Sequence, residues 1–439
     1  MKKIFFLFLF ILVAQQSFAT THTVTITGGD NRTNITNAIS GLVDFDTLYF
    51  PACSAYVAHP TITITVKIKI IGVDTSNTIL YRSSSSTDGN LLNVPFFTFD
   101  GSSWNLAPSG VKVQGIKFKS KEPSIDDAGA DGKSIALDQA LRFDYVSSFE
   151  VKDCSFWWFG NGAVYVNHRD YFARGLIHNS GFFWNAKGAS GLGYGYGVVI
   201  YGENNQWIPY INNTDGNSIV IEDCVFKFHS HSIAAGGCAN YTSRYNDFWN
   251  SIISENESKH ALDAHGQQGN GGDLGSDNYF STRIMISHND SVRNTLFFDR
   301  TAYISNGSTT LSRPMERLLL SRGGELIVHD NYFYGGRFAC SISYDGSAWA
   351  YPYLFGQGYA SGLTYPSTHT GTSPSQSYGD TFIWNISYSV YDGSNGDGTM
   401  FYNYKTSDFL NNRDYHQSTN SSAAKINYTD IPYPYVNHY

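Results

Sequence analysis

The side chains best suited to chemistry gather in one short stretch, KHALDAHG at Lys259–Gly266. If the apolar residues that alternate with them point into a core, Asp263 and His265 point outward from one face of a single strand. The two side chains then lie about 7 Å apart along the strand, so one substrate can touch both. A carboxylate near an imidazole raises the pKa of the histidine and orients it as a general base. With His260 at the start of the strand, the stretch predicts an acid–base site.

Two other interpretations remain open for the same residues. The cluster can be a hydrogen-bonded surface group, or its histidines can anchor the glycine-rich insert that follows. His260, Asp263 and His265 also have the nitrogen and oxygen donors that zinc or another divalent cation takes, although their spacing matches no established metal motif. Calcium prefers more carboxylates, and Asp273 and Asp277 in the next loop keep it as an alternative cofactor.

Four further residues extend the predicted site to substrate binding. Arg283 closes the glycine-rich loop at the start of RIMIS, and Arg300 follows LFFD. A guanidinium binds a carboxylate through two parallel hydrogen bonds, as an acidic glycan requires, whereas pairing with nearby acids is the alternative. Trp207 lies inside a polar insert, where a flat ring can stack on a sugar. Asp215 is a candidate for a second carboxylate across from Asp263.

A recurring four-residue signature indicates how distant residues are brought together. Its copies are DCSF (Asp153–Phe156), NSGF (Asn179–Phe182), DCVF (Asp223–Phe226), YNDF (Tyr245–Phe248), DNYF (Asp330–Phe333) and a looser NDS (Asn289–Ser291). In chain order, the intervals between the ends of successive copies are 26, 44, 22, 43 and 42 residues. The shortest is about one turn of a β-solenoid, and the longer ones are one turn plus an inserted loop. Stacked turns place His231 about 5 Å from His260, which adds His231 to the predicted catalytic group.

The cysteines favour a ladder of stacked side chains over a disulfide. Cys154 and Cys224 occupy one position of the repeat, where the other copies have Ser180, Asn246, Asn289 and Asn331. We expect these side chains to face inward, with the buried thiols acting as small apolar fillers. A disulfide is the alternative, but Ser180 lies on the turn between the two cysteines. Two turns separate them by about 9–10 Å, which is beyond the reach of a disulfide.

The N-terminus and the net charge limit the partners. Residues 1–19 have the pattern of a secretory signal, with Lys2 and Lys3, the apolar run Ile4–Val13 and a small-x-small site at Ser17–Ala19. We therefore expect a secreted or periplasmic protein. Removing the segment changes the formal net charge from −8 to −10, which argues against nucleic acid because phosphate binding needs a basic surface. No later apolar run is long enough to span a membrane.

The remaining chain is predicted to form one solenoid, since solenoids exceed the size limit of single-core domains. The coil covers residues 20–345, with an amphipathic helix at Asn34–Leu42 capping its open end and VKVQGIKF at Val111–Phe118 as the first turn of the body. From 346 to 439 the repeat fades into Tyr, Gly, Ser and Pro. We expect the last turn or turns there, including Thr381–Tyr388, followed by capping loops.

These features together resemble the pectin-lyase-like superfamily of right-handed parallel β-helices. The resemblance lies in the helix, in DTLYFPACSAYVAHPTITITVKIKIIGVDTSNTIL and in the stacked V-x-x-x-D/N-C/N-x-F turns, and it covers about residues 34–344. It implies an all-β, single-stranded parallel β-helix with an N-terminal helical cap and long loop insertions. The superfamily includes lyases, hydrolases, epimerases and non-catalytic adhesins, so the fold assigns no reaction. Ser230 and His231 stand where polygalacturonases have paired aspartates, which argues against that mechanism.

The combined expectation is an exported protein that cleaves a polysaccharide by β-elimination on an acidic, uronate-containing glycan. His265 or His260 would act as the base, Asp263 would orient it, and Arg283 would neutralise the uronate. A non-catalytic glycan-binding or surface adhesion protein that uses the same groove is the alternative. Glycoside hydrolysis is a third option, and it needs a second carboxylate such as Asp215 across from Asp263.

Overall fold

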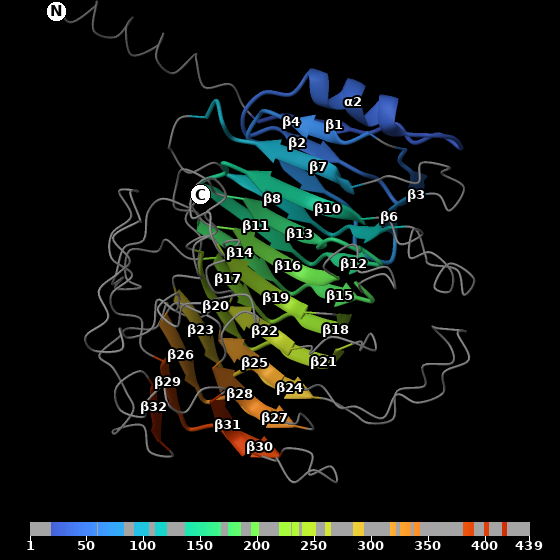
Figure 1. The fold of residues 1–439 in the computed structure, drawn as a ribbon. Coiled ribbons are helices and arrows are strands. Elements are labelled where there is room, and N and C mark those ends of the chain that lie inside the picture. The colour runs from blue at the N-terminus through green and yellow to red at the C-terminus, as the bar shows by residue number, and fades with distance from the viewer. Residues whose placement is uncertain are drawn as a thin grey trace, which may run out of the picture.

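The computed structural model is an almost all-β coil with a single described helix and parallel strand pairing throughout (Figure 1). The structure describes residues 19–58, 60–82, 92–104, 110–120, 137–167, 174–185, 195–201, 219–229, 231–236, 239–251, 260–264, 284–293, 317–321, 325–334, 338–342, 381–389, 399–403 and 415–418. The signal segment predicted at 1–19 lies almost entirely outside them, and export stays a prediction.

The strands form three parallel sheets, here called A, B and C. Sheet A contains β1 (Thr21–Thr23), β2 (Thr47–Tyr49), β5 (Lys69–Ile71), β8 (Val111–Gln114), β11 (Ser148–Lys152), β14 (Arg174–His178), β17 (Ile219–Glu222), β20 (Asn240–Arg244), β23 (Ile284–His288), β26 (Glu325–His329), β29 (Thr381–Trp384) and β32 (Tyr415–Ser418). Sheet B contains β3 (Cys53–Tyr56), β6 (Thr78–Tyr81), β9 (Lys117–Lys119), β12 (Ser155–Trp157), β15 (Gly181–Phe183), β18 (Val225–His229), β21 (Asp247–Ser251), β24 (Ser291–Arg293), β27 (Tyr332–Tyr334) and β30 (Ser387–Ser389). Sheet C contains β4 (Ile62–Ile64), β7 (Leu92–Asp100), β10 (Leu137–Asp144), β13 (Val164–Asn167), β16 (Tyr196–Tyr201), β19 (His231–Gly236), β22 (His260–Ala264), β25 (Arg317–Ser321), β28 (Phe338–Ile342) and β31 (Thr399–Asn403).

The strand order makes the molecule a right-handed parallel β-helix, as the sequence predicts. Strands that are hydrogen-bonded neighbours from β2 onward are three apart in the chain, so each coil passes through sheets A, B and C in turn. The helix α2 (Arg32–Ser40) lies at the N-terminal end of the coil in Figure 1 and buries Ile35 in the core. It starts and ends two residues before the predicted 34–42. Buried Asn31 sets the start, because its side chain bonds Thr27 and Gly29 of the preceding turn.

The first turn of the body lies earlier in the chain than the sequence suggested. Two complete coils, β2–β3–β4 and β5–β6–β7, precede the turn at Val111–Phe118 that we expected to be the first of the body. These coils lack the signature because their passage from sheet A to sheet B is longer, with three residues after Tyr49 and six after Ile71. The alternating β-branched residues identified the strands but not their place in the coil.

A two-residue corner joins sheet A to sheet B in every coil from β8 to β30. Its first residue has a left-handed backbone, with φ of 48° to 56° at Asp153, Asn179, Asp223, Tyr245, Asn289, Asp330 and Asn385. Asp and Asn tolerate this conformation better than other non-glycine residues, which explains why they dominate the start of the signature. The signature is therefore the sequence of this corner and the strand that follows.

The second corner residue faces inward and forms the predicted ladder. The backbone N–H of Cys224 donates to Asn246 Oδ1 at 2.9 Å, and that of Asn246 donates to Asp290 Oδ1 at 3.0 Å. The N–H of Asp290 donates in turn to Asn331 Oδ1 at 2.7 Å. We expected Asn289 in this ladder, which was wrong by one residue. Asn289 has the left-handed backbone, and Asp290 fills the inward position.

The two cysteines of the ladder are free thiols, as predicted. Cys154 and Cys224 are buried, and Ser180 lies between them, where its Oγ accepts the N–H of Cys154 at 3.1 Å. Burial raises the pKa of Cys154 to about 12, so this thiol is protonated and chemically inert at neutral pH. The thiols therefore serve packing.

The phenylalanine that ends the signature forms a stack through the core. Ring centroids are 5.5 Å apart for Phe118 and Phe156, 4.9 Å for Phe156 and Phe182, 4.6 Å for Phe182 and Phe226, and 4.8 Å for Phe226 and Phe248. These separations follow the spacing of adjacent strands, roughly 4.7–4.9 Å. One residue type at one position thus fixes the register of successive coils.

The coil continues into the C-terminal part of the chain. Strands β29, β30 and β31 pair with β26, β27 and β28, and β32 pairs with β29, so that the segment between Thr381 and Ser418 extends all three sheets. They include the turn expected at Thr381–Tyr388. The division into a coil up to 345 and a capping region from 346 to 439 stays a prediction.

Candidate functional site

The outer face of sheet C brings together the described members of the predicted site. His231 on β19 pairs in register with His260 on β22, as expected from one turn to the next. Asp263 pairs with Ala234, which belongs to a cluster outside the main core, whereas its neighbours Leu262 and Ala264 belong to the core. Asp263 therefore lies on the outer side of the strand, at the alternating position that the sequence assigns to it.

His231 and Asp263 form a shielded pair. The Nδ1 atom of His231 lies 3.6 Å from Oδ2 of Asp263, and the imidazole stacks on Tyr196 at 4.7 Å with an interplanar angle of 13°. Asp263 is 0% exposed and His231 8% exposed, so the carboxylate is more enclosed than an open surface patch would be. A buried carboxylate is stable only when charges or hydrogen-bond donors compensate for lost water, and the imidazole is suited to do so.

Three tyrosines continue the site beyond His231. Tyr165 on β13 and Tyr201 on β16 are half-buried, and their rings are 5.6 Å apart at an angle of 38°. Both pack against a small apolar cluster, formed by Tyr196, Val199 and Ala234, that is separate from the core. The three tyrosines therefore extend over the two adjacent strands β13 and β16, and Tyr196 adjoins His231 of the His231–Asp263 pair.

A polar group borders the other side of the tyrosine cluster. Arg142 Nε donates to both carboxylate oxygens of Asp144, at 2.9 and 2.7 Å, and Asn167 Nδ2 donates to Asp144 Oδ1 at 3.0 Å. The Arg142 guanidinium also lies 5.2 Å from the centre of the Tyr165 ring. Sequence reasoning missed this group, although the alternation in LRFD and VYVN gives Arg142, Asp144, Tyr165 and Asn167 outward positions.

The other predicted site residues lie outside the described residues, and their roles stay predictions. They are His265, Arg283, Arg300, Trp207 and Asp215. For His260 the structure gives the backbone and its pairing alone.

Neither a metal centre nor a membrane span is found in the described part of the chain. No group of three or more histidine, cysteine, aspartate or glutamate side chains there is arranged to hold a metal ion. The loop with Asp273 and Asp277, which kept calcium as an alternative cofactor, lies outside that part. The one described helix, α2, is neither long nor apolar enough to cross a bilayer.

Neither a protein-family model nor a curated protein sequence matches the chain. Among solved structures it is similar to PfbA, a surface adhesin of Streptococcus pneumoniae, with 13% identity and a TM-score of 0.42 over 88% of this chain and 94% of that one. It is also similar to ORF18 of Geobacillus virus E2, with 14% identity and a TM-score of 0.37 over 88% of this chain and 63% of the viral chain.

A third similar structure is the catalytic domain of a GH87 α-1,3-glucanase in complex with tetrasaccharides, with 8% identity and a TM-score of 0.34 over 88% and 69% of the two chains. At these scores the similarities carry no argument about activity. The assignment of the fold rests on the strand pairing of this chain.

Proposed function

We propose that the protein is an exported, carbohydrate-active member of the pectin-lyase-like superfamily that binds a polysaccharide across the outer face of sheet C. The observation that carries this proposal is the tyrosine cluster of Tyr165, Tyr196 and Tyr201, with polar groups on both sides. Rings of this kind offer flat apolar surfaces for the faces of sugar rings, and their hydroxyls bond to sugar hydroxyls.

The polar groups favour an acidic glycan at this face. Arg142 is 26% exposed and lies beside Tyr165, so its guanidinium is accessible next to the half-buried ring. A guanidinium with free N–H groups binds a uronate carboxylate through two hydrogen bonds. Asp144 holds Arg142 in place through Nε and leaves the outer N–H groups of the guanidinium for a ligand.

Glycan binding is tested with a Tyr165→Ala/Tyr201→Ala variant and calorimetric titration against soluble polygalacturonate, alginate and neutral glucans. Loss of two half-buried rings should weaken binding of the uronate polymers about tenfold or more. Tyr332→Ala, which removes an exposed ring from sheet B, is the matched control and should bind as the parent does. Unchanged affinity in the double variant would refute binding at this face.

A second candidate function, cleavage by β-elimination, is favoured by the His231–Asp263 contact. In this reaction a base removes the proton on the carbon next to the uronate carboxylate. The electron pair then forms a carbon–carbon double bond as the glycosidic oxygen leaves. Asp263 contacts His231 directly, so the described geometry supports His231 as the base, beside the predicted His260 and His265. The carboxylate would hold the imidazole in one orientation and stabilise its protonated form.

Cleavage is tested by the ultraviolet absorbance of the unsaturated product. His231→Ala should lower the rate by roughly 10²- to 10⁴-fold, which is the usual contribution of a general base. His260→Ala and His265→Ala, assayed separately, show whether either histidine holds the role instead. Product that forms at the parent rate in all three variants would eliminate the reaction while leaving glycan binding intact.

A further inference from the structure

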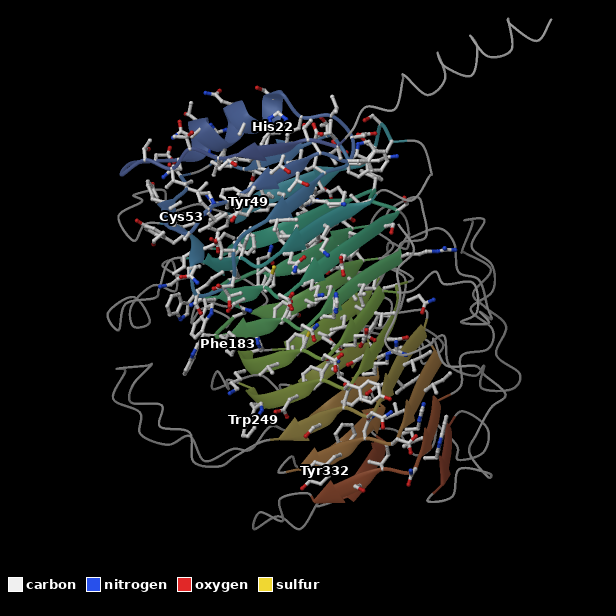
Figure 2. The ribbon with its side chains drawn as sticks, turned by 180° about the vertical axis from the view of Figure 1, so that it is seen from behind. His22, Tyr49, Cys53, Phe183, Trp249 and Tyr332 are labelled. Atoms are coloured by element: carbon white, nitrogen blue, oxygen red, sulfur yellow. The ribbon has the colours of Figure 1, made fainter. Side chains whose placement is uncertain are left out.

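The outer face of sheet B carries a row of aromatic and basic side chains that no predicted role uses. Trp157 pairs in register with Lys119 on one side and Phe183 on the other. Phe183 pairs with Lys227, and Lys227 pairs with Trp249. In Figure 2, Phe183 and Trp249 follow one another along this side of the coil. Five successive strands thus place aromatic or long basic side chains at one position.

These side chains form a continuous half-buried surface. The Trp157 and Phe183 rings stack at 4.5 Å with an angle of 27°, and the Lys227 ammonium lies 5.3 Å from the centre of the Trp249 ring. The indole N–H of Trp157 donates to Ser155 Oγ at 2.7 Å, and that of Trp249 donates to Asp247 Oδ2. Both indoles are therefore held in fixed orientations and support Phe183 and Lys227 between them, so a ligand of these two side chains finds the surface already formed.

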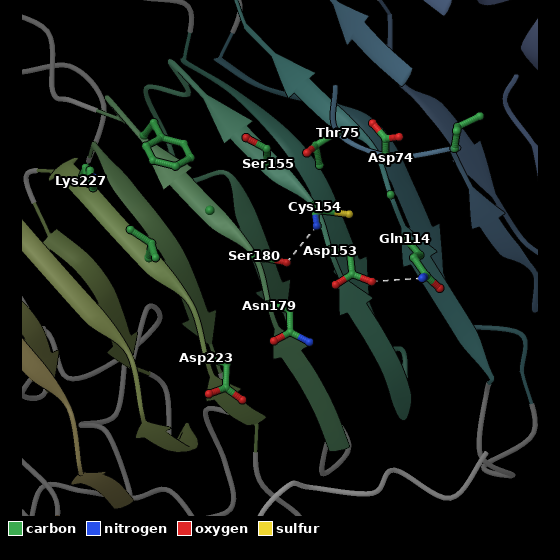
Figure 3. Close-up of a pocket in the computed structure, with 15 residues that line it drawn as sticks. Asp74, Thr75, Gln114, Asp153, Cys154, Ser155, Asn179, Ser180, Asp223 and Lys227 are labelled. Atoms are coloured by element: carbon green, nitrogen blue, oxygen red, sulfur yellow. Dashed lines mark hydrogen bonds between the residues drawn. The ribbon is translucent and has the colours of Figure 1, made fainter. Parts of the chain in front are cut away.

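A groove of about 730 Å³ runs between this row and the corner that joins sheets A and B (Figure 3). Ser155, Gly181 and Val225 form its floor, with Phe183 and Lys227 on one side. Gly181 is needed for this shape, because a Cβ there would lie 2.5 Å from the Phe183 ring. The aromatic ring can cover the floor only where the backbone carries no side chain.

The opposite side of the groove is formed by the corner residues of three successive coils. Asp153, Asn179 and Asp223 lie next to one another at the strand ends in Figure 3. Their carboxylate and amide groups repeat once per coil, at a spacing of roughly 5 Å. Hydrogen-bonding groups therefore run along the axis of the coil, parallel to the row of rings.

The charges of the groove favour a neutral ligand. Its lining contains three carboxylates, those of Asp74, Asp153 and Asp223, against the single ammonium of Lys227. Such a lining repels uronate or sulfate groups and accepts hydrogen bonds from hydroxyls. Aromatic faces beside carboxylates and amides are the combination that suits the apolar faces and the hydroxyl edges of sugars.

We propose that this groove is a second binding site, which takes a neutral polysaccharide chain lying along the axis of the coil. The sugar faces stack on Phe183, which Trp157 supports from behind, and the hydroxyls donate to Asp153 and Asp223. The site is distinct from the outer face of sheet C, where Arg142 favours acidic glycans. It would hold the protein on a neutral polymer while the other face engages a different chain.

The test is affinity gel electrophoresis with soluble neutral glucans, mannans and galactans, and with polygalacturonate and alginate as anionic counterparts. The parent protein should be retarded by at least one neutral polymer, and Phe183→Ala should weaken that binding about tenfold. Gly181→Ala, which displaces the Phe183 ring, should act in the same direction. Phe45→Ala removes an exposed ring outside the groove and should bind as the parent does.

Two outcomes would overturn the proposal. One is a parent protein that binds no neutral polymer of the panel. The other is full neutral-polymer binding in Phe183→Ala and Gly181→Ala proteins whose melting temperatures match the parent. The Tyr165→Ala/Tyr201→Ala variant separates the two sites, because it should lose uronate binding and keep the neutral polymer. If that variant alone loses the neutral polymer, the groove is refuted and the sheet C site stands.

Discussion

The outer faces of sheets B and C use the same coil geometry in opposite ways. On sheet C the polar pair is enclosed, with Asp263 0% exposed and His231 8% exposed beneath the stacked Tyr196. On sheet B the rings of Trp157 and Phe183 stay half-exposed beside an open groove. Shielding from water strengthens electrostatic interactions, as proton transfer requires, whereas exposed rings serve adhesion to a ligand. In the proposed functions, the enclosed His231–Asp263 pair would serve chemistry, whereas the half-buried rings on both faces would serve binding.

The largest effect is expected from a change in the core that both faces share. The Phe226 ring stacks on Phe182 and Phe248, and it lies where a Cβ on Gly197 of sheet C would touch it. Phe226→Ala should lower the free energy of unfolding by about 3–5 kcal/mol, measured by urea denaturation. Binding at both faces should weaken together. If Phe226→Ala loses one ligand and keeps the other, the two faces do not both depend on packing of the shared core.

Asp290, inside the corner between sheets A and B, offers a change that should alter stability while leaving the outer faces of sheets B and C intact. Burial raises the pKa of Asp290 to about 6, although hydrogen bonds from Ser243, Asn246 and Ser287 oppose the shift. The folded protein therefore holds this proton more tightly than the unfolded chain. The contribution of Asp290 to the free energy of unfolding is therefore fully present below about pH 4. It falls by about 3 kcal/mol as the pH rises through 6.

Asp290→Asn should remove that loss, because the ladder already accommodates Asn246 and Asn331 at equivalent positions. Urea denaturation of the two proteins at pH 4 and pH 7 measures the difference. The variant should be more stable than the parent at pH 7 and similar to it at pH 4. Equal stability of the two proteins at pH 7 would contradict the raised pKa of Asp290. Unchanged glycan binding by the variant is the control, since it shows that the outer faces of sheets B and C are unaltered.

An ion-paired carboxylate on the outer face of sheet A, that of Glu150, should have a smaller effect on stability. Burial raises the pKa of Glu150, but hydrogen bonds from His178 at 2.9 Å and Lys112 at 2.9 Å outweigh it and leave the pKa at about 2. This stabilisation is present above about pH 4.5 and is lost as the pH falls towards 2. Glu150→Gln should therefore cost about 2 kcal/mol at neutral pH and nothing at pH 2. Thermal melts across this range check it, and a pH-independent difference would argue against the ion pairs.

The fold could be predicted from the sequence because the corner between sheets A and B uses the same residue types in successive coils. Asp or Asn in a left-handed conformation, then a small or amide side chain, then phenylalanine two residues later, gave the coil and the alignment of His231 with His260. The looser copy at Asn289 was misplaced by one residue, since Asn and Asp suit both corner positions.

The burial of Asp263 and the aromatic row on sheet B could not be predicted from the sequence. The enclosure of Asp263 depends on neighbours from other coils, His231 among them, and no local pattern reveals it. Likewise Trp157, Phe183 and Lys227 share a position only once the register of sheet B is known. The stretch WWF at Trp157–Phe159 does not tell which rings face out, and the structure buries Phe159 while leaving Trp157 half-exposed.

The two-residue corner also decides where this chain can grow. Extra residues between Asp153 and Ser155, or at the same place in later coils, would break the ladder and the phenylalanine stack. From β8 onward, insertions are therefore restricted to the other two corners of the coil. The groove beside the short corner therefore keeps its outline, while the rim of sheet C is free to vary. Under the two proposed binding roles, variants of this scaffold could exchange the specificity of sheet C and retain that of the groove.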